Sequence, residues 1–170
     1  MLSKFCSTAS IAAVTAYLCL TPAHADEAKI DKNEAKCLAT AIYFEARGES
    51  SKGQRGVGQV ILNRVEDPRY PDTVCGVVYQ NAHRRNACQF SFACDGQSEA
   101  ITDRTSWKAA VAHSAELLAC DEECRASDRI GAAFWSATHY HADYVSPRWA
   151  KKLKRIGTIG AHLFYAEHIS

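Results

Sequence analysis

Glu45 is the residue whose type and position most clearly suggest chemistry. It follows Leu38 by seven residues and Ile42 by three, on the apolar stripe of a helix predicted over residues 34–47. A carboxylate there is costly unless it is paired or protonated, and the negative end of the helix dipole disfavours it further. Both effects raise the pKa of a carboxylic acid. An acid that holds its proton near neutral pH can serve as a glycosidase's general acid.

The sequence leaves alternatives open for both acids of this segment. Glu45 is also consistent with a buried structural residue that pairs with Arg47 or Arg64. Glu49 lies just past Gly48, which is expected to end the helix. Glu49 is consistent with the second carboxylate of a two-acid glycosidase, but its place beyond the helix favours a surface charge or one that pins a loop.

Two histidines alternate on a predicted strand. His139 and His141 point to the same face, because side chains alternate along a strand. With His162 or His83 they would offer nitrogen ligands for a metal ion, and without a metal they would line a polar cleft and bind sugar hydroxyls. The spacing alone is weak evidence for a metal, so we expect no metal and no cofactor.

The N-terminal segment over residues 1–25 has the pattern of a secretory signal peptide. Lys4 precedes an apolar run over residues 11–20, and small residues lead up to a signal peptidase site at Ala25. The apolar run is too short to span a bilayer comfortably. We therefore expect cleavage after Ala25, a periplasmic or secreted protein, and no integral membrane association.

Charge and motifs narrow the class of function. The formal net charge is +1, which gives no global sign of a nucleic-acid or membrane partner. The chain has neither a Gly-rich phosphate loop nor a Gly-x-Ser-x-Gly elbow. The basic run over residues 151–155 is most simply a solvated face, although it would also attract an anionic polymer. Hydrolytic or lyase chemistry on a substrate outside the cytoplasm is the class that remains.

An even number of cysteines follows the predicted cleavage site. An even count in an exported protein favours disulfides. Two pairs are close in sequence and suggest local loops, which leaves the other two cysteines to join each other. The expected pairs are Cys37 with Cys75, Cys88 with Cys94, and Cys120 with Cys124. The alternative, a zinc site at Cys120 and Cys124, conflicts with an oxidising compartment.

The elements that must position these residues are mostly helical. Apolar periodicity and capping residues predict helices first, and β-like stretches come only near the end. The predicted helices cover residues 34–47, 54–65, 74–80 and 103–119, and the predicted strands lie at 137–141 and in a hairpin over 155–165 bent at 157–160. This order predicts one α+β domain over residues 37–170, after a mobile segment over residues 26–36.

Six segments of the chain recur, in the same order, in a known family. The segments are Ala41-Ile-Tyr-Phe-Glu-Ala-Arg-Gly-Glu49, Gly58-Gln-Val-Ile-Leu-Asn-Arg-Val65, Tyr70-Pro-Asp-Thr-Val-Cys-Gly-Val-Val-Tyr-Gln80, Cys88-Gln-Phe-Ser-Phe92, Ala137-Thr-His-Tyr-His-Ala142 and Ile159-Gly-Ala-His-Leu-Phe-Tyr165. Together they resemble the SleB-type cell wall hydrolases, the family of the spore cortex-lytic enzymes, in an exported Gram-negative member. They cover nearly all of residues 37–165, and six in order are far more specific than any one alone.

This resemblance implies a lysozyme-like, helix-rich α+β fold with a small antiparallel sheet, and action on the glycan strands of peptidoglycan. In the family, the first Glu of the Glu-Ala-Arg-Gly-Glu motif is taken as the catalytic acid, which here is Glu45. The likeness also implies lytic transglycosylase chemistry, for which one acid suffices and neither water nor metal is required. The residues expected in the substrate cleft are Glu49, Gln89, Ser91, His139 and Tyr140.

Three other functions stay open at this point. The same site would serve a muramidase-type hydrolase, and the histidines would suit a metal-dependent wall amidase. A non-catalytic peptidoglycan-binding module would keep the cleft without the activity. Peptidoglycan is the expected partner in each case, no nucleic acid is expected, and the sequence names no protein partner.

Overall fold

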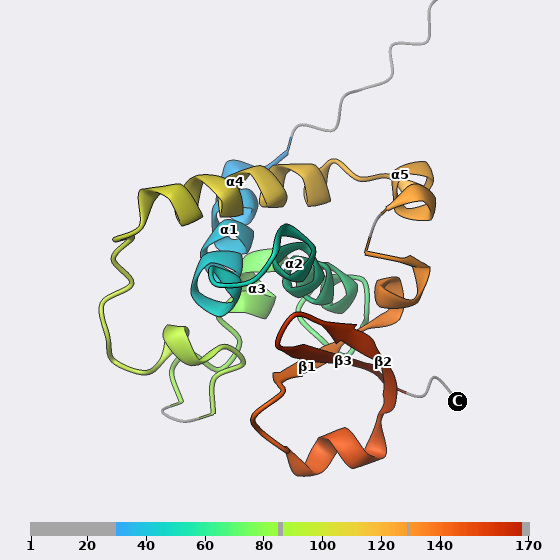
Figure 1. Cartoon of the computed structure of the whole chain (residues 1–170). Helices are drawn as coiled ribbons and strands as arrows, with labels where there is room; N and C mark the ends of the chain where they lie inside the picture. The colour runs from blue at the N-terminus through green and yellow to red at the C-terminus, as the bar shows by residue number, and fades with distance from the viewer. Residues whose placement is uncertain (1–29, 85–86, 129, 168–170) are drawn as a thin grey trace, which may run out of the picture.

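The computed structural model describes residues 30–84, 87–128 and 130–167 (Figure 1). The predicted signal peptide lies outside the described residues. The α-helices are α1 (Lys32–Ala46), α2 (Ser51–Val65), α3 (Val74–Val78), α4 (Arg104–Leu118) and α5 (Glu122–Ser127). The 3-10 helices are η1 (Ser91–Ala93), η2 (Ala132–Ser136) and η3 (Arg148–Lys152), and the strands are β1 (His139–Ala142), β2 (Lys154–Ile159) and β3 (His162–Ala166).

Side-chain caps fix where the first two helices begin. The Asp31 carboxylate accepts hydrogen bonds from the backbone of Asn33 and Glu34, so α1 starts two residues earlier than predicted. The Ser50 hydroxyl accepts from the backbone of Gly53, so α2 starts three residues earlier than predicted. Only four residues then separate α1 from α2. Glu45, in the last turn of α1, and Glu49, in the connection, therefore lie at the same end of this helix pair.

Helix α2 lies in the middle of the domain, with α1 and α4 on one side and the sheet on the other (Figure 1). Its glycines allow this close packing. A Cβ added at Gly58 would lie 2.5 Å from Leu117 and 3.0 Å from Ile42, and one added at Gly56 would lie 3.0 Å from Phe164. These two glycines therefore let Leu117, Ile42 and Phe164 approach the backbone of α2.

The three strands form an antiparallel sheet in the order β1-β3-β2. The register pairs Tyr140 with Phe164 and Ala142 with His162, so these four side chains share one face. The hairpin turns at Gly160, which has a φ of +56°. This turn lies at the end of the predicted bend at residues 157–160, and the pairing is irregular between Arg155 and Gly157. The register decides which face of the sheet each residue occupies.

Two apolar clusters stabilise the domain, and they meet at one residue. The helical cluster is built on α1, α2, α3 and α4, with fully buried Leu38, Ile42 and Ile61. The second cluster joins α2 to the sheet through residues such as Phe164. Tyr140 is partly buried and packs against both clusters. The helix-rich architecture with a small antiparallel sheet confirms the predicted α+β class.

Three disulfides bridge the described residues. They join Cys37 to Cys75, Cys88 to Cys94, and Cys120 to Cys124, the pairing expected from the spacing. The first ties α1 to α3, whereas the other two close short loops. None of the helices in the described part of the chain is both long and apolar enough to cross a bilayer.

Candidate active site

Glu45 occupies the last turn of α1 and is partly buried. Burial raises the pKa of its carboxyl above the ordinary value, and a hydrogen bond from Tyr140 opposes that rise. The Tyr140 hydroxyl donates this bond to Glu45 Oε2 at 3.0 Å. On balance the pKa of the Glu45 carboxyl is raised.

Tyr140 is held in place by the aromatic packing of the sheet. Its ring lies 5.1 Å from the His162 ring and 5.9 Å from the Phe164 ring. Burial first, and the negative charge of Glu45 second, raise the pKa of the Tyr140 hydroxyl well above its ordinary value. The phenol therefore stays protonated and acts as a fixed donor to Glu45.

Neither candidate arginine pairs with Glu45. Arg47 contacts Tyr43, whose hydroxyl accepts a hydrogen bond from the guanidinium at 3.3 Å. Arg64 is buried and donates from Nε to the Thr138 carbonyl at 2.7 Å. Glu45 makes no ion pair within residues 30–84, 87–128 and 130–167. The alternative of a buried Glu–Arg pair is thus not what the structure contains.

Glu49 bonds to the hairpin turn between β2 and β3. The Ala161 backbone N–H lies 3.3 Å from Oε1 and 3.4 Å from Oε2 of Glu49, and it donates to this carboxylate. His162 Nδ1 lies 3.9 Å from Oε1. Gly160 leaves the space that the carboxylate fills, because a Cβ there would collide with Glu49 Oε2. The Glu49 carboxylate therefore holds the turn between β2 and β3 in place.

The contacts form a continuous row of polar side chains across three elements. Glu45 bonds to Tyr140, Tyr140 packs on His162, and His162 faces Glu49. His162 is buried, and its Nδ1 has no hydrogen-bond partner among the described residues. Burial lowers the pKa of His162, while the nearby charges of Glu49 and Asp143 oppose that shift. We call this set, Glu45, Tyr140, His162 and Glu49, the acid row.

Sequence reasoning missed the place of His162 in this row. The sequence suggests His162 only as a further metal ligand beside His139 and His141, with His83 as the alternative. The signal was the strand alternation after the hairpin turn, which puts His162 and Phe164 on one face. Because the predicted bend spanned residues 157–160 and did not fix the turn at Gly160, that face could not be derived.

The loop that carries Gln89 and Ser91 lies beside the last turns of α1. Phe92, in η1, stacks on Phe44 with ring centroids 5.0 Å apart, and Phe44 directly precedes Glu45 in the chain. The Gln89 backbone N–H donates to the Gln80 carbonyl at 3.0 Å, and Ser91 is exposed. The structure thus brings this loop next to the helix turn that holds Glu45.

His139 lies on the opposite face of β1 from Tyr140. Its Nδ1 is 3.0 Å from Thr138 Oγ1, and its ring packs 5.1 Å from the Trp149 ring. Burial, with help from the positive charges of Arg64 and Arg69, lowers the pKa of His139 to about 4. The structure therefore does not bring His139 together with the acid row.

The histidines proposed as metal ligands are divided by the sheet. His139 and His141 share the outer face of β1, whereas His162 shares the inner face with Tyr140. His141 Nε2 bonds to the Tyr165 hydroxyl at 2.9 Å. The sheet therefore prevents these three side chains from converging on one ion.

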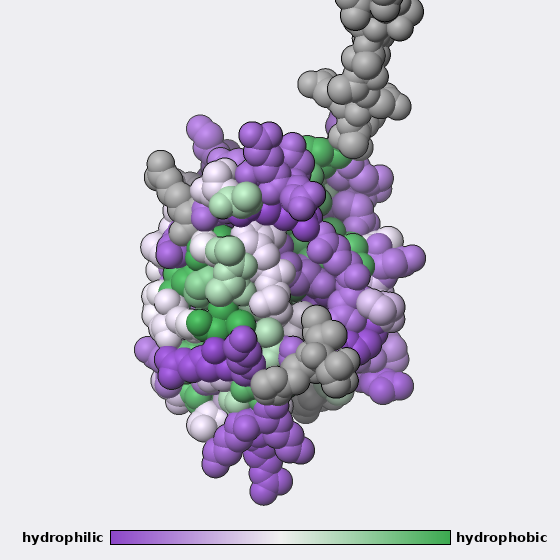
Figure 2. Space-filling model, turned by 90° about the vertical axis from the view of Figure 1, so that its right-hand side faces the viewer, coloured by the Kyte–Doolittle hydropathy of each residue, from purple (hydrophilic) through white to green (hydrophobic). Residues whose placement is uncertain are grey.

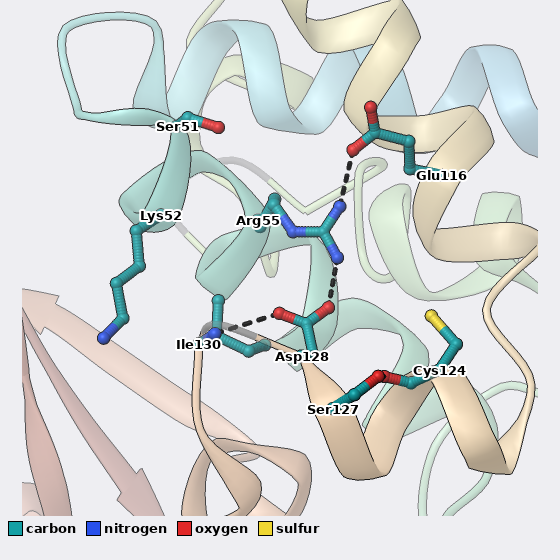
Figure 3. A pocket seen from close by; sticks show the side chains of 8 residues that line it. All are labelled: Ser51, Lys52, Arg55, Glu116, Cys124, Ser127, Asp128 and Ile130. Carbon is teal, nitrogen blue, oxygen red and sulfur yellow. Dashed lines mark hydrogen bonds and ion pairs between the residues drawn. The ribbon is translucent and has the colours of Figure 1, made fainter.

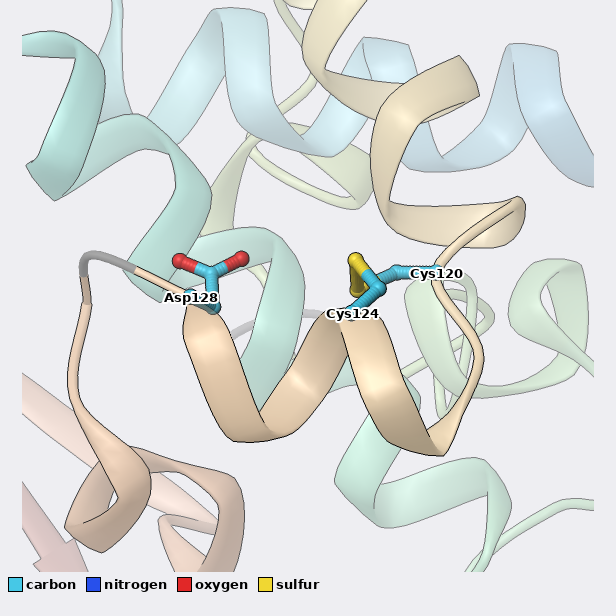
Figure 4. A group of neighbouring side chains, drawn as sticks. All are labelled: Cys120, Cys124 and Asp128. Carbon is cyan, nitrogen blue, oxygen red and sulfur yellow. A yellow bond between two sulfur atoms is a disulfide. The ribbon is translucent and has the colours of Figure 1, made fainter.

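Among the described residues, Cys120, Cys124 and Asp128 have side-chain atoms close enough together to hold a metal ion (Figure 4). Cys120 and Cys124 form a disulfide, so neither offers a thiolate. The Asp128 carboxylate instead pairs with Arg55. The donor chemistry of this group does not suit a metal ion while the disulfide is intact.

A cavity of about 530 Å³ lies between α2, α4 and α5 (Figure 3). The Arg55 guanidinium points into it and bridges Glu116, at 2.6 Å, and Asp128. Asp128 also accepts a hydrogen bond from the Ile130 backbone at 2.9 Å. Arg55, Glu116 and Asp128 thus satisfy one another, and no member of the acid row lines the cavity.

Comparison with known proteins finds relatives along most of the chain. The cell wall hydrolase family matches residues 48–165. The spore cortex-lytic enzyme of Halalkalibacterium halodurans is 30% identical over 149 residues, which cover 82% of this chain and 39% of that protein. The spore cortex-lytic enzyme of Bacillus cereus is 29% identical over 133 residues, which cover 78% of this chain and 44% of that protein. The chain thus spans about two-fifths of the length of these relatives.

Two solved structures share the architecture. The catalytic domain of the Bacillus cereus SleB protein matches with a TM-score of 0.56 and 30% identity, over 79% of this chain and 91% of that one. The catalytic domain of the germination-specific lytic transglycosylase SleB from Bacillus anthracis matches with a TM-score of 0.57 and 29% identity, over 81% and 98%. The family match covers most of the chain and begins just after Glu45. The chain belongs to the cell wall hydrolase family.

Proposed function

We propose that this protein cleaves peptidoglycan glycan strands as a lytic transglycosylase, with Glu45 as its single acid and base. The observation that carries the proposal is the Glu45 carboxyl, whose pKa is raised by burial and which accepts a hydrogen bond from Tyr140. A solved relative with 29% identity is described as a lytic transglycosylase. Membership of the cell wall hydrolase family fits the same substrate class.

The reaction needs one proton donor that later becomes an acceptor. Glu45 gives its proton to the glycosidic oxygen between N-acetylmuramic acid and N-acetylglucosamine, and the bond from that oxygen to C1 breaks. The Glu45 carboxylate then takes the proton of the muramic C6 hydroxyl, and the C6 oxygen bonds to C1. A 1,6-anhydro ring and a free N-acetylglucosamine hydroxyl result, and Glu45 ends in its starting form.

Tyr140 has a defined part in this cycle. Its hydrogen bond is stronger to the carboxylate than to the neutral acid, so it stabilises Glu45 after the first proton transfer. Packing on His162 and Phe164 keeps the hydroxyl aimed at Oε2. Tyr140 therefore lowers the energy of the intermediate state without transferring a proton itself.

The position of Glu49 supports a one-acid mechanism. A two-acid hydrolase needs a second carboxylate that can activate water or attack the sugar. Glu49 instead accepts from the Ala161 backbone and fills the space left by Gly160. Muramidase-type hydrolysis remains the second candidate, because Glu49 lies in the same row as Glu45.

The remaining site residues are proposed with smaller roles. Gln89 and Ser91 lie on the loop beside the Glu45 turn, and we assign them to hydrogen bonds with N-acetyl or hydroxyl groups of the sugar. His139 lies across the sheet and would reach only a distant part of the polymer. The disulfides and the predicted signal peptide support action outside the cytoplasm.

The first experiment is mass spectrometry of the soluble products from purified sacculi. The intact protein should release fragments with 1,6-anhydromuramic ends, and Glu45→Gln, folded by circular dichroism, should release none. Glu49→Gln is the matched control, because an amide oxygen can still accept from Ala161, and it should keep most of the activity. Reducing muramic ends, together with loss of activity in Glu49→Gln, would establish hydrolysis with two carboxylates instead.

A further inference from the structure

A strongly basic segment crosses the outer face of the sheet. We name residues 144–155 the basic strap. Its cations are all exposed, and they are Arg148, Lys151, Lys152, Lys154 and Arg155. The chain has no Asp or Glu between Asp143 and Glu167. None of the five cations forms an ion pair with any residue that the structure describes.

Trp149 fixes the strap to the sheet. Its ring lies 5.1 Å from His139, 5.5 Å from His141 and 5.5 Å from Tyr165. The strap's 3-10 helix η3 is at the bottom of the molecule in Figure 1, and Figure 2 shows hydrophilic side chains covering that end. Because packed aromatic rings anchor the backbone at Trp149, the strap needs little backbone ordering on binding.

The strap starts at the end of the sheet that carries the acid row. The Asp143 backbone N–H donates to the Ala161 carbonyl at 2.7 Å, and the Ala161 N–H in turn donates to Glu49. Tyr144 follows directly and is 85% exposed, and Val145 is 44% exposed. A chain that enters along Glu49 would therefore meet an exposed aromatic ring before it reaches the cations.

We propose that the basic strap binds the carboxylate-bearing part of the polymeric substrate outside the bond that is cut. This inference rests on the proposed function, and it deepens it by adding a second contact surface. Peptidoglycan carries free carboxylates on its stem peptides, and Tyr144 offers a face on which a sugar ring can stack. Unpaired cations on a fixed surface attract such a polymer over about a Debye length, roughly 8–10 Å at physiological salt.

Continuity with the acid row selects the substrate over a lipid surface. An anionic membrane would also attract the cations, but its binding would engage only two exposed apolar side chains, Tyr144 and Val145. Contacts with a remote part of the same polymer supply binding energy for the reaction at Glu45. The strap therefore makes activity on the intact wall depend on salt.

The test measures binding to purified sacculi in the Glu45→Gln background, so that nothing is digested. Lys151→Glu with Lys152→Glu should weaken sedimentation with sacculi at low salt by at least about tenfold. Lys36→Glu with Lys108→Glu is the matched control. It makes the same change in net charge on exposed positions of α1 and α4, and it should leave binding unchanged. Melting curves establish that both variants are folded.

Three results would overturn the inference. Binding that survives the strap substitutions shows that the strap does not contact the polymer. Equal losses in the strap and control variants show an effect of net charge alone. If flotation with vesicles of acidic phospholipid depends on the strap lysines and binding to sacculi does not, the strap binds a membrane surface instead.

Failure of the proposed function would be seen separately. A protein that binds sacculi through the strap but releases no fragments keeps the strap's role and loses the lytic activity. A protein that releases fragments but binds equally well without the strap lysines keeps the activity and loses the strap's role.

Discussion

At Glu45, two opposing effects set the proton affinity of one carboxyl. Burial raises its pKa, and the Tyr140 hydroxyl, which donates to the carboxylate, lowers it. In its proposed role as general acid, Glu45 must be protonated when substrate arrives, so activity should fall as the pH rises past the pKa of Glu45. Under this proposal, the balance between the two effects sets the pH range of the reaction.

Removing the Tyr140 hydroxyl should move that range. In Tyr140→Phe the ring keeps its packing on His162 and Phe164, but the carboxylate loses its donor. The pKa of Glu45 then rises further, so the alkaline limb of the pH–rate profile should shift to higher pH. The maximal rate should fall by roughly tenfold or more, since a charged hydrogen bond contributes about 1.5–3 kcal/mol. The rate at which soluble fragments are released, measured across pH, gives both the alkaline limb and the maximal rate. An alkaline limb that does not move would show that Tyr140 does not influence the pKa of Glu45.

The raised pKa of Glu45 also has a consequence for stability. Because the folded state raises this pKa above the ordinary value of 4.5, the ionised form destabilises the fold above that pH. Glu45→Gln should therefore melt at a higher temperature than the parent at pH 7, and the difference should vanish well below pH 4.5. Thermal unfolding at both pH values measures this, and a variant less stable at pH 7 would contradict it.

At the scale of elements, the hairpin turn and the α1–α2 connection hold the acid row together. Glu49 lies just after the end of α1 and accepts a hydrogen bond from the Ala161 backbone. Gly160 leaves the space that the Glu49 carboxylate fills. The positive φ at Gly160 is a conformation that most side chains adopt only at a cost. The glycine is thus required both by the backbone and by the carboxylate.

Gly160→Ala should destabilise the domain. The left-handed backbone costs about 1–2 kcal/mol for a residue with a Cβ, and the methyl group also displaces Glu49. Gly48→Ala is the matched control, because a Cβ there meets no atom within 4 Å. Urea unfolding should show a clear loss for Gly160→Ala and a change within about 0.5 kcal/mol for Gly48→Ala. Similar urea midpoints for Gly160→Ala and Gly48→Ala would show that the turn does not require a glycine at position 160.

At the scale of the whole molecule, two apolar clusters and the three disulfides of the described residues stabilise a domain with α2 at its centre. The Cys37–Cys75 bridge spans 38 residues, whereas the Cys120–Cys124 bridge spans four. A cross-link lowers the entropy of the unfolded chain more when it closes a longer loop. The bridge between α1 and α3 should thus dominate the disulfide contribution to stability.

Replacing both cysteines of a pair by serine tests this ranking. Loss of the Cys37–Cys75 bridge should lower the free energy of unfolding by about 2–4 kcal/mol. Loss of the Cys120–Cys124 bridge should cost less. Urea unfolding of the two double variants provides the comparison, and an equal or reversed order would show that local strain or packing outweighs loop entropy.

Much of the fold and part of the site followed from the sequence alone. Apolar spacing predicted four of the helices and placed Glu45 on a buried stripe, because a helix repeats its faces every 3.6 residues. The spacing of the cysteines led to the observed pairs. The short α5 and the 3-10 helices were not predicted, because each has too few residues to carry a periodic pattern.

Only the tertiary structure decided which residues share the site. Tyr140 and His139 are adjacent in sequence, but the sheet sends one to Glu45 and the other to Trp149. His162 joined the acid row because the turn falls at Gly160, and a shift of one residue would have put it on the other face. The sequence determines the chemistry that each side chain can do, whereas the register of the sheet and the packing of α2 determine which of them meet.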